Sequence, residues 1–316
     1  MLSLGGVALS LSGCGFLADR PLRIASQVWP GYELMFLARE QGWLDASRVH
    51  LIETTSASDS LQALAEGRVD GAALTLDEVL TARSRGIALS VVMIFDMSAG
   101  ADMLLVRPDI EKLSDLKGRR IGVEQGAVGG LMLASILRSA GLKKQDVTEV
   151  LLTIDRQADA WSQNQVDAVI TYEPVASKLL DQGGVKLFDS RDIPDTIVDV
   201  LAIRSDALDR GHARAVRHLL SAHFQALDYF NRNPYDSAFR MASRLHLQAD
   251  RVLSEYKGLL LPDADNNRRL LAGARPELLE TARRVSAIMV ESKLLPRDDP
   301  MDGLLRAEFL PAAGMN

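Results

Sequence analysis

The chain has 316 residues, of which 47% are hydrophobic, and this length suits two domains because single cores stop growing at roughly 250 to 300 residues. The formal net charge of −6 and the lack of a dense Lys/Arg cluster argue against nucleic acid as a partner. Beyond the first 17 residues, no apolar run approaches the roughly 20 residues of a membrane span.

Residues 1–19 are predicted to be a signal and tether outside the fold. An apolar run ends in Leu11, Ser12, Gly13 and Cys14, and Cys14 is the only cysteine of the chain. The run resembles a bacterial lipoprotein signal, which implies cleavage before Cys14, lipidation of that residue and attachment to a membrane through the lipid alone. The usual basic residues are missing from the run, and a buried strand with an incidental cysteine is the alternative.

The first third of the chain alternates predicted strands and helices. Strands are expected at 21–28, 48–54, 69–74, 87–95 and 101–106, and helices at 34–41, around 61–65 and at 77–85. Arg107 and Pro108 break the last of these strands, because proline cannot donate to a strand ladder. We place the first crossover between two lobes at this break.

Polar and aromatic residues stand in the loops that follow these strands. Trp29, Tyr32 and Glu33 surround a Pro-Gly turn whose geometry needs none of them. Trp29 is therefore either packing under the loop or a stacking wall for a flat ligand. Ser58 and Asp59 are helix caps, and a cap in a cleft can also face a ligand.

Residues 120–142 read as a strand, a glycine loop and a helix, and they repeat the start of the chain. The phrase RI at 23 recurs at 120, and VD at 69 recurs at 166, in each case 97 residues later. Two similar β-α-β-α-β units are therefore expected. Gly126, Gly129 and Gly130 have neither the dinucleotide-binding spacing nor a following Lys-Ser/Thr, so they are expected to bring backbone amides close to a ligand other than a nucleotide.

The second unit is followed by a return to the first lobe and by a helical tail. Strands are expected at 147–152, 166–171, 185–189 and 196–203, and helices at 157–164, from 174, at 214–230 and at 276–294. Glu173 either caps the helix that Pro174 starts or contacts a ligand, and Asp199 interrupts an apolar strand. The predicted division is lobe I at 20–106 plus 204–316, with the C-terminal helices on it, and lobe II at 107–203.

This pattern predicts an α/β fold with two lobes, each a sheet flanked by helices, and a ligand cleft between them. Ligands of open α/β sheets bind beyond the carboxyl ends of the strands, where loops lead into helix N-termini. The candidate ligand-binding residues are Trp29, Tyr32, Glu33, Ser58, Asp59, Thr75, Asp96, Gln125, Gly126, Thr171, Tyr172, Glu173 and Asp199.

The sequence offers no catalytic set. Four of the five histidines lie in the helical tail, and no two of them are spaced four residues apart. There is no GxSxG motif, and Cys14 is the only thiol. No catalytic residue, metal site or cofactor is therefore expected, and the leading hypothesis is a monomeric binding protein.

From residue 21 to 301 the chain resembles the solute-binding proteins of the nitrate/sulfonate/taurine and hydroxymethylpyrimidine-precursor group of bacterial ABC importers. The resemblance is carried by WP at 29, ALAEGRVD at 63, DLKGRRIGV at 115 and VDAVITYEP at 166. It implies a type II periplasmic-binding fold that delivers a small solute to a permease and an ATPase. It also places Trp29 and Glu173 where the binders of pyrimidine (thiamine) precursors carry a Trp and a Glu.

Charge in the predicted cleft loops decides between the solutes of this group. Nine acids stand there against Arg156 alone: Glu33, Asp59, Asp77, Glu78, Asp96, Glu124, Asp155, Glu173 and Asp199. A pyrimidine-like or cationic nitrogen solute is therefore favoured over nitrate, taurine or a sulfonate, which is the alternative within the same fold. Alternatives of another class are a pyrimidine-synthase-like enzyme, whose cysteine-rich iron site this chain lacks, and a periplasmic sensor module.

Overall fold

A computed structural model of the chain describes residues 20–124, 126, 128–209 and 211–312. The first half of the chain forms β1 (Leu22–Ser26), η1 (Pro30–Tyr32), α1 (Glu33–Glu40), β2 (Val49–Glu53), α2 (Ala57–Ala65), β3 (Gly71–Thr75), α3 (Leu76–Ser84), β4 (Leu89–Ser98), β5 (Met103–Val106), η2 (Leu113–Leu116), β6 (Arg120–Val123), α4 (Val128–Ala140), η3 (Lys144–Asp146), β7 (Thr148–Leu151) and α5 (Ile154–Ser162). The second half forms β8 (Ala168–Thr171), α6 (Val175–Asp181), β9 (Val185–Asp189), η4 (Ser190–Asp192), β10 (Val198–Arg204), α7 (Ser205–Asp209), α8 (Ala213–Arg232), α9 (Pro234–Leu245), α10 (Ala249–Glu255), β11 (Leu259–Leu260), α11 (Ala264–Leu271), α12 (Glu277–Glu291) and η5 (Ala307–Phe309).

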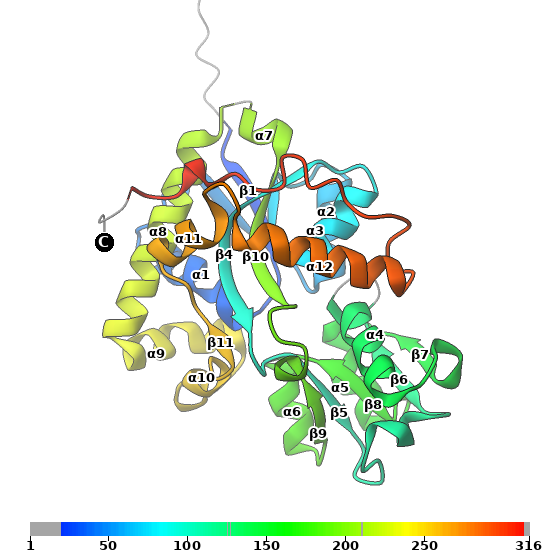
Figure 1. The fold of residues 1–316 in the computed structure, drawn as a ribbon. Coiled ribbons are helices and arrows are strands. Elements are labelled where there is room, and N and C mark those ends of the chain that lie inside the picture. Colours follow the sequence, from blue (N-terminus) through cyan, green and yellow to red (C-terminus); the bar gives the residue numbers. More distant parts are fainter. Residues whose placement is uncertain (1–19, 125, 127, 210, 313–316) are drawn as a thin grey trace, which may run out of the picture.

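The strands form two mixed sheets, and Figure 1 shows them as two lobes side by side. The sheet of the first lobe has the order β11-β4-β10-β3-β1-β2, and that of the second has the order β7-β6-β8-β5-β9. Helices flank both sheets, so the predicted α/β class with two lobes is confirmed.

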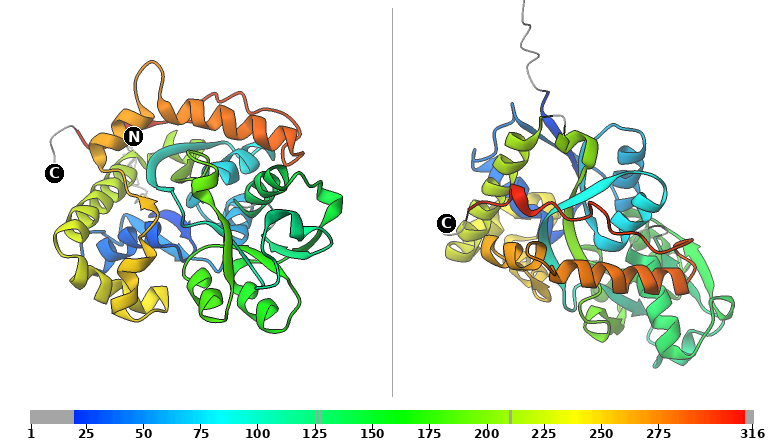
Figure 2. Two further views of the ribbon diagram at one scale, coloured as in Figure 1. Left: turned by 60° about the horizontal axis from the view of Figure 1, so that its bottom comes forward. Right: turned by 45° about the horizontal axis from the view of Figure 1, so that its top comes forward.

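Two strands belong to the lobe other than the one predicted for them, which corrects the predicted boundaries. β5 pairs antiparallel with β8 and β9 in the second sheet, and β10 pairs antiparallel with β3 and β4 in the first. The crossings therefore lie at residues 99–102 and 190–197, and not at 106/107 and 203/204. The break at Pro108 marks the end of β5, whereas lobe membership depends on which sheet accepts the strand's backbone hydrogen bonds. Figure 2 shows both connections from two further directions.

The predicted repeat is visible in the strand register. In the first lobe Ile24 lies opposite Gly71 in the parallel pair β1–β3. In the second lobe Ile121 lies opposite Ala168 in the parallel pair β6–β8, each partner 97 residues further along the chain. β2 and β7 complete the two units as parallel neighbours of β1 and β6.

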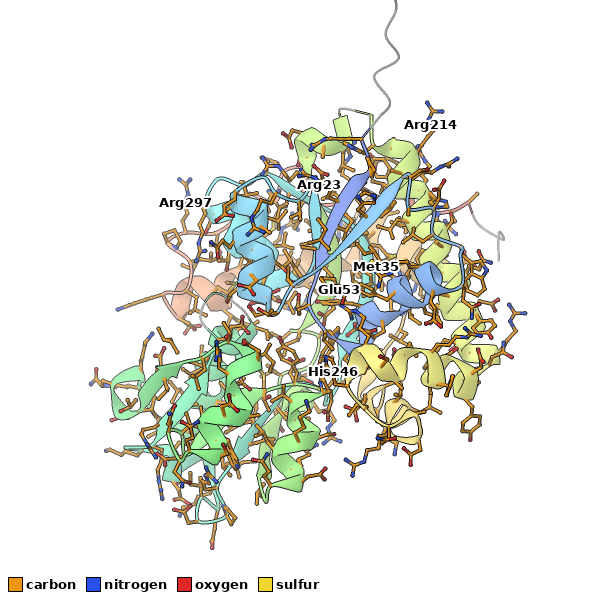
Figure 3. All side chains as sticks on the ribbon, turned by 180° about the vertical axis from the view of Figure 1, so that it is seen from behind. Arg23, Met35, Glu53, Arg214, His246 and Arg297 are labelled. Carbon is orange, nitrogen blue, oxygen red and sulfur yellow. The ribbon has the colours of Figure 1, made fainter. Side chains whose placement is uncertain are left out.

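The C-terminal helices cover the first lobe, as predicted. α8 packs on α1, and α12 packs on α3. The second lobe also contacts this layer, since Leu131 of α4 is buried within the hydrophobic cluster that contains Leu80 of α3 and Met289 of α12. The parallel strands of the first sheet run toward the second lobe: Figure 3 shows Arg23, near the start of β1, far from the second lobe and Glu53, at the end of β2, closer to it. Their carboxyl ends therefore face the space between the lobes.

Candidate functional site

A small cavity lies between the lobes at the carboxyl ends of the strands. It is lined by Gln27, Trp29, Tyr32, Thr75, Glu78, Asp102, Val128, Tyr172 and Asp199. Its volume is about 10 Å³, which is the space of about one water molecule. A larger hollow of about 370 Å³ lies beside Arg23 and Asp70, but there Arg23 pairs with Asp70 and Arg204 with Asp206. The interlobe cavity is the candidate site because its polar groups are left without protein partners.

The turn η1 places two aromatic side chains on two aspartates. Trp29 Nε1 donates to Asp96 Oδ2 at 3.0 Å, and the Tyr32 hydroxyl donates to Asp199 Oδ1. A Cβ atom on Gly31 would lie 1.8 Å from Asp96 Oδ2, so only glycine allows the turn to come this close to β4. The Pro-Gly turn therefore fixes the aromatic wall by direct contact with the acids beneath it.

Asp96 and Asp199 lie next to each other on adjacent strands, because they are register partners in the antiparallel pair β4–β10. Both are fully buried, and each keeps one carboxyl oxygen without a hydrogen-bond partner, Asp96 Oδ1 and Asp199 Oδ2. The register of two strands from different parts of the chain thus brings two acids together.

The start of α3 adds a third carboxyl group. The backbone N–H of Thr75 donates to Glu78 Oε2 at 2.8 Å, so Glu78 folds back over the first turn of the helix as a cap. Thr75 Oγ1 is buried and has no partner. A hydroxyl and a buried carboxyl group are therefore presented together at the end of β3.

The remaining walls come from the crossing segment and the second lobe. Asp102 stands between β4 and β5 with Oδ2 buried and unpartnered. Tyr172, after β8, meets Trp29 edge to face with ring centroids 5.3 Å apart, and its hydroxyl is also unpartnered. Unpartnered polar atoms from four separate elements thus converge on one cavity, which is unusual in a closed interior and typical of a binding site.

The site is strongly acidic. Burial raises the pKa of Asp102 to about 7 and that of Asp77 to about 6. The pKa values of Asp199 and Glu78 lie well above the usual range because of burial, reinforced by the charges of neighbouring acids. Among the residues that the structure describes, no Arg, Lys or His lines the cavity. The electrostatics therefore favour protons or another cation there.

Six of the thirteen candidate ligand residues come together at this site. Trp29, Tyr32, Thr75, Tyr172 and Asp199 line the cavity, and Asp96 holds Trp29. Trp29 is only 4% exposed, as packing under the loop requires, and it also lines the cavity.

Two predicted ligand acids have other partners. Glu33 forms a buried ion pair with Arg244 of α9, outside the cavity lining. Glu173 accepts from the backbone N–H of Ser177 at 2.9 Å and from its hydroxyl at 3.1 Å, so it caps α6. The local capping energy decides both the direction of Glu173 and its absence from the cavity lining.

The loop before α2 closes one side of the cleft but does not line the cavity. Ser56 is the helix cap, because its hydroxyl accepts from the Asp59 N–H at 3.1 Å. Ser58 instead donates to Glu124 Oε1 of the second lobe, from its N–H at 3.0 Å and its hydroxyl at 2.7 Å. Asp59 accepts from the hydroxyl of Thr55.

The glycine loop is explained by packing. Gly126 has φ +78°, and a Cβ on Gly129 would lie 2.9 Å from Val123 and 3.1 Å from the backbone of Glu124. Gly126 does not line the cavity, nor does Thr171, whose buried Oγ1 has no partner. Gln125 lies outside the described residues.

Four lining residues were not among the candidates: Gln27, Glu78, Asp102 and Val128. Glu78 was counted as a cleft acid but was not named as a ligand residue. In the structure it both caps α3 and lines the cavity. Asp102 was missed because β5 was assigned to the first lobe. The available signal was an acid at the point where the chain passes from β4 of the first sheet to β5 of the second. Val128 and Gln27 carry no chemical signal in the sequence.

Further contacts join the lobes around the cavity. Ser177 Oγ lies 3.3 Å from Glu255 Oε1 of α10, and Arg251 of α10 pairs with Asp181 of α6 at 2.8 Å. With the Ser58–Glu124 contact on the other side, these show the lobes closed on each other.

Two further properties bear on function. Within the described part of the chain, no group of three or more His, Cys, Asp or Glu is arranged to hold a metal ion. Across the same residues, no helix combines the length and apolar character needed to cross a bilayer.

Comparison with known proteins agrees with this architecture. The family model described as NMT1/THI5 like matches residues 29–237. A putative aliphatic sulfonates-binding protein of Escherichia coli (strain K12) is 24% identical over 305 residues, which cover 92% of this chain and 93% of that protein. The taurine-binding periplasmic protein of the same organism is 25% identical over 182 residues, 57% of this chain and 56% of that protein.

Among solved structures, the alkanesulfonate-binding protein SsuA from Xanthomonas axonopodis pv. citri, bound to MOPS, is similar with a TM-score of 0.76 at 19% identity. The match covers 91% of this chain and 98% of that one, so the two lobes form the periplasmic-binding-protein fold. The family model covers well over half of the chain. The chain therefore belongs to the NMT1/THI5-like family.

Proposed function

We propose that this protein captures a small cationic nitrogen compound, such as an amidine or a protonated aminopyrimidine of the thiamine-precursor kind, for an ABC importer. The observation that carries the proposal is the composition of the cavity: three carboxyl groups, from Glu78, Asp102 and Asp199, and no lining Arg, Lys or His among the described residues. A cation gains a partner there when one of these carboxyl groups gives up its proton, whereas an anion finds no cationic partner among the described lining residues.

The unpartnered atoms also suit a donor-rich ligand. Asp102 Oδ2 and Asp199 Oδ2 are free to accept N–H groups, and the hydroxyls of Thr75 and Tyr172 are free to accept or donate. Trp29 and Tyr172 add aromatic faces, and a cation against such a face gains roughly 0.5 to 2 kcal/mol. A flat, charged nitrogen compound would use both kinds of group at once after the lobes open, since the closed cavity of about 10 Å³ has space for about one water molecule.

A sulfonate is the second candidate solute, because named relatives are sulfonate- and taurine-binding proteins. A sulfonate needs cationic or N–H donors around its oxygens. The basic residue expected nearest to the cleft, Arg156, is 70% exposed and pairs with Asp155 at 3.3 Å. Neutral carboxyl groups and the hydroxyls of Thr75 and Tyr172 are the donors that remain for such a ligand.

The proposed partners follow from the family. We infer that the protein acts as a periplasmic monomer beside a permease and an ATPase, held to a membrane by lipid on Cys14, a residue outside the described part of the chain. Cys14→Ser is expected to move the protein from the membrane fraction to the soluble fraction of its host. Wild-type protein found soluble and without lipid would contradict the anchor.

A thermal-shift screen tests the solute class. The panel contains amidines, primary amines and aminopyrimidines on one side, and taurine, alkanesulfonates and nitrate on the other. A ligand at about 100 times its Kd adds about 2.7 kcal/mol to stability, so the responding class is readily seen. A response to sulfonates alone would overturn the proposal in favour of the second candidate.

Variants locate the binding to this cavity. Asp102→Asn and Trp29→Ala are expected to weaken the response without removing it, because they remove one free acceptor and one aromatic wall of the cavity. Asp228→Asn is the matched control, since Asp228 lies on the surface of α8 and pairs only with Arg232 on the same helix. An unchanged response in Asp102→Asn would exclude this cavity as the site.

A further inference from the structure

More carboxyl groups surround the cavity than the charge of one small cation can neutralise. Glu78, Asp102 and Asp199 line it, and Asp77 and Asp96 are their fully buried neighbours. Asp96 and Asp199 stand opposite each other on paired strands. Like charges this close in a dry interior cannot all be ionised, so part of this carboxyl cluster carries protons when no solute is bound.

Within the part of the chain that the structure describes, the elements packed around the carboxyl cluster supply no compensating charge. Tyr32 from η1 and Tyr172 from the second lobe offer neutral hydroxyls, and Glu124 adds another buried acid. Behind Phe95, His223 of α8 is buried with neither ring nitrogen bonded, and burial lowers its pKa to about 3, so it is neutral.

The remaining neighbours are on the far side of Phe95 and Glu33. Tyr256, which follows α10, is half-buried, and burial together with the nearby charges of Glu33 and Asp96 raises its pKa. Arg244 is held by Glu33 and Glu53. Protons are therefore the counter-ions that the fold itself leaves available to the carboxyl cluster.

We propose that the carboxyl cluster exchanges protons for its solute, so that capture of a cation releases protons and weakens as the medium becomes acidic. This inference rests on the proposed function. The exchange balances: an O–H bond of Asp102 or Asp199 breaks, its proton passes to a solvent base, and the carboxylate that remains pairs with an N–H group of the cation.

The exchange falls in an accessible range of pH. Burial raises the pKa of Asp102 to about 7, and burial together with the charges of Asp96 and Asp102 raises the pKa of its neighbour Asp199 well above the usual range. Each proton released makes the apparent affinity fall up to about tenfold per pH unit below the pKa of that carboxyl group. Capture is therefore expected to be tight near pH 8 and weak near pH 5.

Calorimetry of the full chain with acetamidine and benzamidine tests the inference. Both probes stay cationic between pH 5 and 8, so any proton exchanged comes from the protein. Titrations at one pH in phosphate and in Tris, whose ionisation enthalpies differ, give the number of protons released from the difference in measured heat. The expected result is release of about one proton or more in wild type, about one fewer in Asp102→Asn, and no change in Asp228→Asn.

The possible outcomes separate the two proposals. An amidine that binds with equal heat in both buffers and equal affinity at pH 5 and 8 overturns the proton exchange and leaves the proposed function standing. Taurine binding with uptake of protons, together with no amidine binding, overturns both, because the protonated carboxyl cluster would then serve an anion. Release of protons that is unaltered in Asp102→Asn and in Asp199→Asn would place the exchange elsewhere and overturn the inference.

Discussion

Asp70 joins β3 to β1 by accepting three hydrogen bonds from Arg23: from the backbone N–H at 2.9 Å, from Nε at 3.0 Å and from Nη2 at 3.0 Å. In the second lobe Asp167 accepts the same three from Arg120, at 2.9, 3.1 and 2.7 Å. The sequence repeat at 97 residues is therefore also a repeat in structure. Each Arg–Asp pair, called a latch below, lies at the end of its sheet opposite to the cavity.

The two latches are expected to differ in strength. Asp70 is 3% exposed and also binds Arg20, whereas Asp167 is 21% exposed and has Arg120 as its partner. Asp70→Asn is expected to lower the free energy of unfolding by about 2 kcal/mol, because it replaces a buried carboxylate that accepts charged hydrogen bonds from Arg23 and Arg20. Asp167→Asn should cost less. Denaturant midpoints of the two variants check this, and an equal loss would contradict it.

Gly31→Ala is expected to abolish solute-induced stabilisation. The new Cβ would meet Asp96 Oδ2 at 1.8 Å, so the turn η1 must lift and the Trp29–Asp96 hydrogen bond must break. Gly130→Ala is the control: its Cβ meets only the side chain of Leu294, at 3.4 Å, and alanine favours α4 by up to about 1 kcal/mol. A normal thermal shift in Gly31→Ala would contradict the proposed role of the turn.

Stability of the unliganded protein is expected to fall as the pH rises from about 4 to 7. The folded-state pKa of Asp102 is raised to about 7 by burial, so in this window the folded state holds a proton that the unfolded state has lost. The contribution is full below the unfolded pKa and is lost as pH rises through about 7, at up to about 1.4 kcal/mol per pH unit. Asp102→Asn should flatten the dependence in urea melts, and an unchanged slope would contradict the assignment.

His223 is expected to act in the opposite direction. Burial lowers its pKa to about 3, so below its ordinary value near 6.5 the unfolded state takes up a proton that the folded state refuses. Its contribution to stability is present above pH 6.5 and is lost as pH falls. His223→Phe removes two unpartnered nitrogens and should raise the denaturant midpoint more at pH 5 than at pH 7.5. His50→Gln, at an exposed position of β2, should show no such difference.

The contact between the two lobes at Glu173 and Glu255 is expected to weaken at alkaline pH. Burial and the nearby carboxyl group of Glu173 raise the pKa of Glu255 to about 8, so the two acids share a proton below that pH and repel above it. Small-angle scattering should show a larger radius of gyration at pH 9 than at pH 7. Glu255→Gln should remain compact at both, and Glu280→Gln on the surface of α12 should behave as wild type. Expansion of Glu255→Gln in alkali would exclude this pair as the cause.

The order and type of the elements were predictable from periodicity. The predicted strands at 21–28 and 166–171 appear as β1 and β8, and the amphipathic helices at 214–230 and 276–294 appear as α8 and α12. The candidate residues that reached the cavity, such as Trp29 and Tyr172, follow strand ends. This succeeded because a loop at the carboxyl end of a parallel strand has a position fixed by its own sheet.

Local sequence also specified the repeat and the acidity of the cleft, since charge and spacing are properties of the chain itself. Pairing between distant strands was decided only in the tertiary structure. β5 pairs within the second sheet and β10 within the first, and these pairings bring Asp199 against Asp96 and place Asp102 in the wall of the cavity. The partner of Glu33 was likewise decided there, since Arg244 is 211 residues away, whereas Glu173 accepts from Ser177 in the local cap that was one of its two predicted roles. Which acids face a ligand depends on such long-range partners, which no local pattern encodes.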